Sequence, residues 1–155
     1  MSEIEVKILV GISGSGKSTM ALAMRSHYPG KPWAICSADH FMVNEKGEYE
    51  FIHAKLHLAH QACIRKYLDL LQRAEPRIVV DNTNCSLWEL APYVAIGHGF
   101  NATVEIIIIH QAVAVAYYRN VHGTPAGTII HQYGKLQKLL NELPSHWNVT
   151  HKLVD

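Results

Sequence analysis

The chain has 155 residues, of which 48% are hydrophobic and 17% are charged, and its formal net charge is +1. This composition excludes disorder, and the near-neutral charge gives no global reason to expect a nucleic-acid partner. The sequence contains no apolar run near the ~20 residues that span a membrane, so we expect no membrane association. The length predicts a single domain over residues 1–155.

The acidic start, Met1–Glu5, is not expected to be a signal peptide. Cys36, Cys63 and Cys85 are widely spaced and odd in number, which is typical of reduced thiols and argues against a disulfide framework or a zinc site. We therefore expect a cytoplasmic protein. The oligomeric state is not indicated by any pattern in the chain.

The first predicted strand, Ile4–Val10, runs into a glycine-rich segment, and a helix follows from Lys17 to about His27, where Pro29 and Gly30 are expected to end it. The segment Gly11–Ser18 matches G-x-x-x-x-G-K-[ST] between a strand and a helix, which is the P-loop signature. Its glycines let backbone N–H groups face a phosphate, its lysine adds a positive charge, and its last hydroxyl is a Mg²⁺ ligand. The chain is therefore predicted to bind a nucleoside triphosphate and Mg²⁺. The predicted nucleotide-binding residues of this segment are Gly11, Ser13, Gly14, Ser15, Gly16, Lys17, Ser18 and Thr19.

Two further strands are predicted before the middle of the chain. The short apolar run Trp33–Ser37 is the second strand, and it ends beside Asp39. The polar stretch 40–50 is predicted to be a loop or a broken helix. Apolar residues at steps of three and four then predict a long amphipathic helix over Phe51–Leu71. Arg77–Asp81 lacks alternation, which indicates a third strand buried on both faces, as in a parallel sheet.

The second half continues the alternation of helix and strand. Ser86 and Glu89 form a capping box that opens a helix, which Pro92 is expected to kink or restart. The later predicted elements are a strand over Thr103–His110, a short helix over Ala112–Asn120, a helix from the N-cap Thr124 and Pro125 toward Pro144, and a fifth strand within 148–154. This order predicts an α/β fold: a doubly wound, mainly parallel sheet of about five strands with helices on both faces. A small helical lid is expected over residues 112–135.

Polar residues at the carboxyl ends of the strands are the candidates for chemistry, because ligands bind at that edge of such sheets. Asp39 is a candidate general base for an acceptor hydroxyl, and the alternative is a helix N-cap. Asp81 resembles a Walker B acid that would hold Mg²⁺ with Ser18, and the alternative is a strand-end carboxylate that fixes the following turn. Arg119 is a candidate lid arginine that contacts the nucleotide, and the alternative is a surface arginine at a helix C-terminus. The predicted catalytic residues are Lys17, Asp39 and Arg119.

The chain also contains 11 histidines, which are scattered. His53, His57 and His60 are spaced to share one helix face, so a zinc site is one interpretation. No carboxylate or cysteine in the pattern completes such a site, which favours ordinary surface and packing roles. His110, after the fourth predicted strand, would either touch the nucleotide or cap the strand.

Four motifs occur in an order and at a spacing that resemble the kinase domain of 5′-hydroxyl polynucleotide kinases. They are the P-loop, Ser37-Ala38-Asp39, Asp81-Asn82-Thr83-Asn84 and Arg119-Asn120-x-His122-Gly123. The chain is also similar, over nearly its whole length, to the broader group of small AAA-type P-loop kinases that includes the zeta toxins. The resemblance implies that Lys17 and Ser18 serve ATP and Mg²⁺, that Asp39 is the base and that Arg119 belongs to a lid. It also implies an acceptor channel shaped by Asp39, Asn82, Thr83 and Asn84.

Two positions depart from the pattern of polynucleotide kinases. Met42 stands where an arginine grips the acceptor's phosphate, and Gly123 stands where a second lid arginine occurs. Negative charge near the first position also disfavours a polyanionic strand. The acidic residues there are Glu45, Glu48 and Glu50.

The leading hypothesis is an ATP- and Mg²⁺-dependent phosphotransferase that moves the γ-phosphate to a hydroxyl. A 5′-hydroxyl of a nucleic acid or nucleotide is the favoured acceptor, and a small-molecule hydroxyl is the close alternative. The competing hypothesis is a nucleotide-binding module or weak ATPase that acts through a protein partner.

Overall fold

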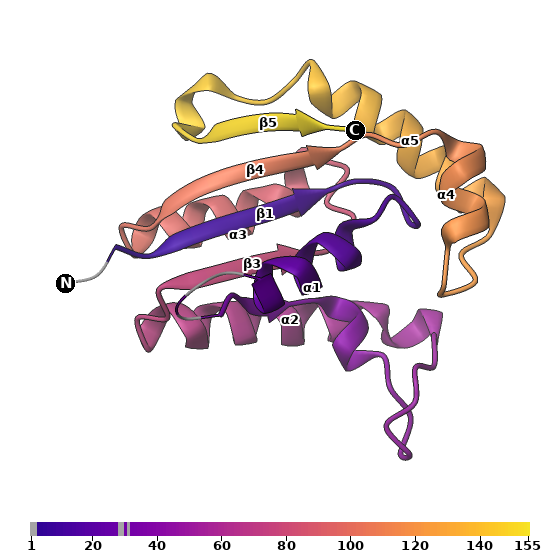
Figure 1. Ribbon diagram of the computed structural model, residues 1–155, viewed down its shortest axis with the longest axis horizontal. Helices are drawn as coiled ribbons and strands as arrows, with labels where there is room; N and C mark the ends of the chain where they lie inside the picture. The colour runs from indigo at the N-terminus through magenta and orange to yellow at the C-terminus, as the bar shows by residue number, and fades with distance from the viewer. Residues whose placement is uncertain (1–2, 28–29, 31) are drawn as a thin grey trace.

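The computed structural model describes residues 3–27, 30 and 32–155, and its strands form one five-stranded parallel sheet in the order β2-β3-β1-β4-β5 (Figure 1). The strands are β1 (Glu5–Val10), β2 (Ala34–Cys36), β3 (Arg77–Asp81), β4 (Thr103–Ile109) and β5 (Thr150–Val154). The helices are α1 (Lys17–His27), α2 (Leu56–Gln72), α3 (Leu87–Gly99), α4 (Val113–Arg119) and α5 (Ala126–Leu140). The predicted doubly wound α/β fold is confirmed. The predicted stop signal at Pro29 lies outside the described residues.

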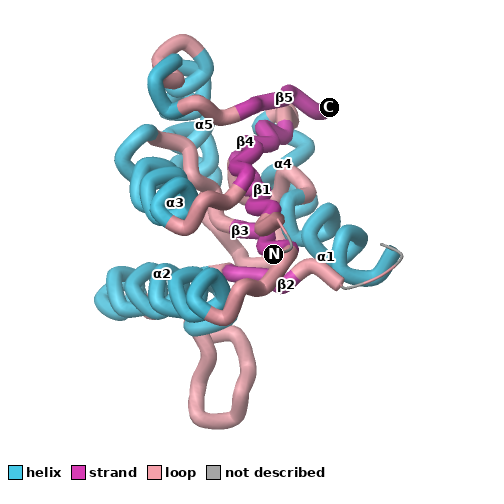
Figure 2. The backbone as a smooth tube through the Cα atoms, turned by 90° about the vertical axis from the view of Figure 1, so that its left-hand side faces the viewer, coloured by secondary structure: helices cyan, strands magenta, loops and turns pink. Residues whose placement is uncertain are grey.

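Helices cover both faces of the sheet, with α2 and α3 on one side and α1 on the other (Figure 2). Val6, Ile8 and Val10 of β1 are fully buried in a large cluster with side chains of α2, α3 and α5. Leu9 belongs to a second cluster, which it shares with Ala21 of α1. Because both faces are covered, the central strands carry continuous apolar runs, as expected for a parallel sheet.

The stretch between β2 and α2 is a loop, as predicted, and it projects from the body of the molecule (Figure 1). A 3₁₀ turn, Ala38–Phe41, follows β2, and Val43 then pairs with Tyr49 in an antiparallel bridge. The Asn44 side-chain oxygen accepts two backbone N–H bonds within the tip, at 2.9 and 3.0 Å. These bonds give the loop a defined, hairpin-like shape.

The helix α2 begins at Leu56, later than the predicted Phe51. Ile52 has an extended backbone, with φ −122° and ψ 109°, and the next three residues form a separate 3₁₀ turn, His53–Lys55. The apolar periodicity was therefore right for the body of the helix and wrong for its first turn. His53 stands in that 3₁₀ turn.

The helix α3 starts after Ser86, which is its N-cap as predicted. The Ser86 hydroxyl donates a 2.6 Å hydrogen bond to the Glu89 carboxylate, and it does not bond a helix N–H, so the capping box is only partly formed. Pro92 neither ends nor restarts the helix, which runs unbroken over Leu87–Gly99. The proline's missing N–H deprives the carbonyl of Trp88 of its helical partner, and Trp88 is 72% exposed.

The predicted lid segment, residues 112–135, contains α4, most of α5 and the turn between them (residues 120–125, the lid turn), and α4 lies beyond the carboxyl ends of β1 and β4 (Figure 1). The N-cap of α5 is Pro125, so the assignment of this role to Thr124 was wrong. A 3₁₀ turn, Ser145–Trp147, leads into β5, which confirms the predicted fifth strand. Within the described part of the chain, none of the helices has the length and apolar character required to cross a membrane.

Candidate active site

The loop between β1 and α1 has the shape of a phosphate cradle. Gly14 and Gly16 have φ values of +81° and +103°, which L side chains rarely adopt. A Cβ on Gly14 would overlap the backbone carbonyl of Ala116, so glycine is what allows α4 to pack against the loop. At the start of the loop, the Gly11 N–H donates a 2.9 Å bond to the Thr83 carbonyl. The loop is therefore supported from the lid and from the segment after β3.

Lys17 begins α1, and only 7% of it is exposed. Its Nζ donates a 2.9 Å bond to the Ile12 carbonyl and lies 3.4 Å from the Ser15 hydroxyl oxygen. Burial lowers the pKa of Lys17, and the nearby Asp81 carboxylate acts in the opposite direction. Because these hydrogen-bond partners are neutral oxygens, an anionic phosphate would bind the ammonium group more strongly.

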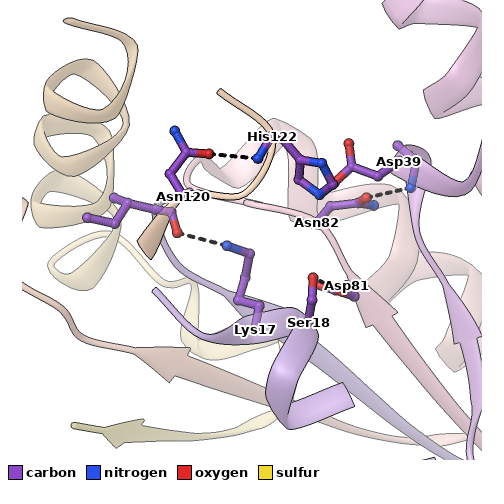
Figure 3. Close-up of polar contacts among 9 residues, drawn as sticks. Lys17, Ser18, Asp39, Asp81, Asn82, Asn120 and His122 are labelled. Carbon is purple, nitrogen blue, oxygen red and sulfur yellow. Dashed lines mark hydrogen bonds and ion pairs between the residues drawn. The ribbon is translucent and has the colours of Figure 1, made fainter. Parts of the chain in front are cut away.

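Ser18 and Asp81 bring two oxygen ligands together at the carboxyl end of β3. The Ser18 hydroxyl donates a 2.9 Å bond to Asp81 Oδ2 (Figure 3). Burial raises the pKa of Asp81, while the positive charge of Lys17 and the Ser18 bond oppose this rise. A hydroxyl beside a carboxylate is the donor set that Mg²⁺ prefers in P-loop proteins, so these residues fit the metal.

A cleft of about 530 Å³ opens between the P-loop, the ends of β2 and β3, and the lid turn. Its volume lies within the range of about 300–1,000 Å³ that is usual for small-molecule sites. The predicted site residues that line it are Ser13, Gly14, Gly16, Lys17, Ser18, Thr19, Asp39, Asp81, Asn82, Thr83 and Arg119. The predicted residues outside this lining are Gly11, Ser15 and Asn84.

Asp39 and Arg119 border the cleft from different elements. Asp39 lies inside the 3₁₀ turn after β2, whose N-cap is Ser37, so the interpretation of Asp39 as an N-cap was wrong. Its side chain is 47% exposed, and its Oδ2 lies 3.4 Å from Nε2 of His122 on the lid turn (Figure 3). Arg119 is exposed and is the last residue of α4. This position is compatible with both interpretations of Arg119, since a side chain at the helix terminus also reaches the cleft.

The polar residues that follow β3 have different surroundings. Asn82 Oδ1 accepts a 2.9 Å bond from the N–H of Ala38, which ties the end of β3 to the turn after β2. Thr83 lines the cleft. Asn84 is buried at φ +50° and donates a 3.0 Å bond to the Leu9 carbonyl. Asn84 thus stabilises the end of β1, and its predicted place in the acceptor channel finds no support in the cleft lining.

Sequence reasoning missed two contacts. Gln132 of α5 accepts a 2.8 Å bond from the Ser13 N–H, so α5 holds the outer arm of the P-loop. The His122 ring packs against the Tyr49 ring at 4.2 Å between centroids. The two residues of the first pair are separated by 119 positions, and no local pattern marks either contact. The only sequence signal for the second contact is that His122 lies within the motif around Arg119.

The surroundings of Met42 and Gly123 explain why these two positions depart from the polynucleotide kinase pattern. Met42 is 3% exposed and belongs to the main core cluster, so its side chain is directed away from an acceptor. Gly123 has φ +68°, a conformation that favours glycine over the arginine seen in the family pattern. Both changes therefore suit this chain's own backbone and packing.

The histidine interpretations are also decided by geometry. Among the described residues, no group of three or more His, Cys, Asp or Glu side chains could hold a metal ion, which contradicts a zinc site on α2. His53 and His57 are exposed, and His60 is partly buried. His110 lies after β4, where its N–H donates a 2.8 Å bond to the Val154 carbonyl, as expected for a strand cap.

A parallel sheet, a P-loop at the end of β1 and a Ser18–Asp81 pair beneath it define the class of P-loop nucleotide-binding proteins. Within that class the chain belongs to the AAA domain family, whose family model matches residues 6–123. Proteins of the P-loop class bind a nucleoside triphosphate together with Mg²⁺.

Several known proteins are similar to this chain. Human NEDD4-binding protein 2 is 33% identical over 89 residues, which are 57% of this chain and 5% of the human protein. A chain of the Pnkp1/Rnl/Hen1 RNA repair complex superposes with a TM-score of 0.75 at 21% identity, covering 93% of this chain and 47% of that one. A gluconokinase from Sinorhizobium meliloti 1021 superposes with a TM-score of 0.62 at 13% identity, covering 99% and 85% of the respective chains. At these identities the solved structures share the fold, and the first two relatives are much longer than the matched segment.

Proposed function

We propose that the protein transfers the γ-phosphate of ATP, in the presence of Mg²⁺, to a hydroxyl group of an acceptor. The observation that carries this proposal is the shared cleft: Asp39 faces the same space as Lys17 and Ser18 of the P-loop. A carboxylate opposite a phosphate cradle is the arrangement that a hydroxyl kinase needs, because the acceptor must lose a proton as it attacks.

The proposed roles follow from position. Lys17 and Arg119 bind the phosphate oxygens and stabilise their negative charge. Ser18 and Asp81 hold Mg²⁺, which when bound neutralises charge on the phosphates. The acceptor oxygen forms a bond to the γ-phosphorus, the bond from that phosphorus to the bridging oxygen of ADP breaks, and the hydroxyl proton passes to Asp39.

A 5′-hydroxyl of a nucleic acid or nucleotide is the favoured acceptor. The motif order and the superposition on a chain of an RNA repair complex at a TM-score of 0.75 support it. A small-molecule hydroxyl is the second candidate, because Met42 is buried where a phosphate-gripping arginine would stand. The exposed acidic residues of the projecting loop also favour an acceptor without phosphates, and they are Glu45, Glu48 and Glu50. The buried free cysteines, Cys36, Cys63 and Cys85, support a reducing, cytoplasmic setting.

The test is transfer of labelled γ-phosphate from ATP and Mg²⁺ to separate acceptors: 5′-hydroxyl DNA and RNA oligonucleotides, nucleosides and amino sugars. We expect one acceptor class to become labelled and Asp39→Asn to lower the rate by about 10²–10⁴-fold, the usual contribution of a general base. Asp39→Asn should bind a fluorescent ATP analogue as the wild type does, because Asp39 lies across the cleft from the P-loop.

Two outcomes would contradict the proposal. Wild-type transfer by Asp39→Asn would show that Asp39 is not the base. Label found only in free phosphate, with every acceptor class unlabelled, would favour a weak ATPase that acts through a protein partner.

A further inference from the structure

The lid turn places a histidine directly against the proposed base. His122 Nε2 lies 3.4 Å from Asp39 Oδ2, and the two side chains are 34% and 47% exposed (Figure 3). They come from segments far apart in the chain, the turn after β2 and the turn between α4 and α5. The contact therefore bridges the two sides of the cleft.

The His122 ring has a second neighbour that limits its orientation. Tyr49, on the projecting loop, stacks against it with 4.2 Å between ring centroids and 37° between ring planes. Burial is the main cause that raises the pKa of Tyr49, and the charge of Asp39 raises it further. The three side chains thus form one group on the acceptor side of the cleft.

The backbone of the lid turn is also held in place. The His122 N–H donates a 3.2 Å bond to Asn120 Oδ1, and Asn120 Nδ2 donates a 2.7 Å bond to the Thr124 carbonyl. These bonds close the turn on itself, and Gly123 at φ +68° completes it. A turn shaped in this way presents the histidine ring to Asp39 without support from the P-loop.

A histidine ring nitrogen 3.4 Å from one carboxylate oxygen restricts how that carboxylate can turn. It fixes the plane of the carboxylate and leaves the second oxygen, Oδ1, to accept the proton of a hydroxyl. The proton from the acceptor is held on Asp39, and His122 gains and loses none.

We propose that His122 is a positioning residue for Asp39, and that the lid turn orients the base only when it lies over the acceptor side of the cleft. This inference rests on the proposed phosphotransfer function. The proposal links the lid turn to the orientation of Asp39, which the P-loop motif alone does not do. Helices α4 and α5 contact the P-loop, whereas the turn between them contacts Asp39.

The test compares His122→Leu with His122→Gln, whose amide N–H can approach the carboxylate as the imidazole does. His131→Leu is the matched control, since His131 is an exposed histidine of α5 outside the cleft lining. With a 5′-hydroxyl DNA oligonucleotide as acceptor, we expect His122→Leu to lower kcat about ten-fold, because the Asp39 carboxylate is then no longer held in one orientation. The KM for ATP should be unchanged, His122→Gln should recover most of the rate, and His131→Leu should match the wild type.

A double-mutant cycle separates positioning from a general structural effect. If His122 acts through Asp39, adding His122→Leu to Asp39→Asn lowers the residual rate no further. An equal ten-fold loss in both backgrounds would overturn the proposal, and so would His122→Gln that is as slow as His122→Leu.

The contact between His122 and Asp39 can also be measured without an acceptor, which tests it separately from the proposed function. Thermal unfolding of wild type, Asp39→Asn, His122→Leu and the double variant should give Tm shifts that do not add, because the two side chains interact. Additive shifts would refute the contact. Non-additive shifts in a protein that labels no acceptor would show that the pairing holds while the phosphotransfer proposal fails.

Discussion

Replacement of Asn82 by leucine tests how the turn that carries Asp39, the proposed base, is tied to β3. Asn82 is 9% exposed, and its Oδ1 accepts a 2.9 Å bond from the N–H of Ala38, which is itself 5% exposed. Leucine keeps the approximate volume but cannot accept a hydrogen bond. The Ala38 N–H would then be buried without a partner, directly before Asp39.

The expected loss of stability follows from that unpaired group. A buried donor left without a partner destabilises the fold by about 1–3 kcal/mol. The other contacts of Asn82 are long, with Nδ2 at 3.4 Å from the Tyr93 hydroxyl and 3.5 Å from the Cys63 sulfur, so they add little. For a chain of 155 residues, a loss of about 2 kcal/mol lowers Tm by roughly 4–8 °C.

The assay is thermal unfolding combined with the rate of phosphate transfer. Asn82→Leu should lower both Tm and kcat, because the turn that carries Asp39 is no longer tied to β3. Tyr93→Phe is the matched control: it removes a hydroxyl on the other side of Asn82 but leaves the Ala38 bond, so we expect a smaller fall in Tm and a nearly normal kcat. An Asn82→Leu protein with wild-type Tm and kcat would refute the anchoring role.

The remaining predictions concern packing and thiol reactivity. A Cβ at Gly97 would lie 2.8 Å from the Tyr67 hydroxyl and 2.9 Å from a Val104 methyl group, so Gly97→Ala should destabilise the protein by about 1–3 kcal/mol in urea unfolding. A Cβ at Gly99, in the same helix, would have no described atom within 4 Å. Gly99→Ala should therefore be neutral or stabilise the protein by up to about 1 kcal/mol. Equal effects of the two substitutions would contradict this packing. Burial raises the pKa of Cys36 and of Cys85 to about 12, so little thiolate is present at pH 8. Alkylation of the native protein should therefore be slow at pH 8, and its rate should rise only as the pH approaches 12. Rapid alkylation at pH 8 before unfolding would show that these thiols are accessible.

The fold was largely predictable because its signals are local. The strand–loop–helix around Lys17, the buried run that ends at Asp81 and the periodicity of α2 each lie within one short stretch, and each was found in the structure. Errors arose at element ends, as at Phe51, where the backbone conformation of single residues decides the boundary. The helix restart expected at Pro92 was wrong, since one missing N–H is tolerated inside α3.

The site was predictable in position but less so in orientation. Asp39 and Asn82 were placed at the correct edge of the sheet, because strand ends in a parallel sheet converge there. Whether a side chain there faces the cleft or bonds a neighbouring backbone group depends on packing between distant segments. Asn82 bonds the N–H of Ala38, Met42 turns into the core, and His122 meets Asp39 across two loops. None of these directions is encoded within a few residues.

The close packing of α4 and α5 on the P-loop also limits which part of the predicted lid segment can move. Ala116 lies against Gly14, and Gln132 is bonded to Ser13, so both lid helices support the loop that would surround the phosphates. A swing of either helix would disturb that support. The short connection that carries His122 stands on the other side of the cleft and is closed by its own hydrogen bonds. If the proposed transfer takes place, a hinge confined to this connection would open the acceptor side of the cleft without moving the helices that support the P-loop.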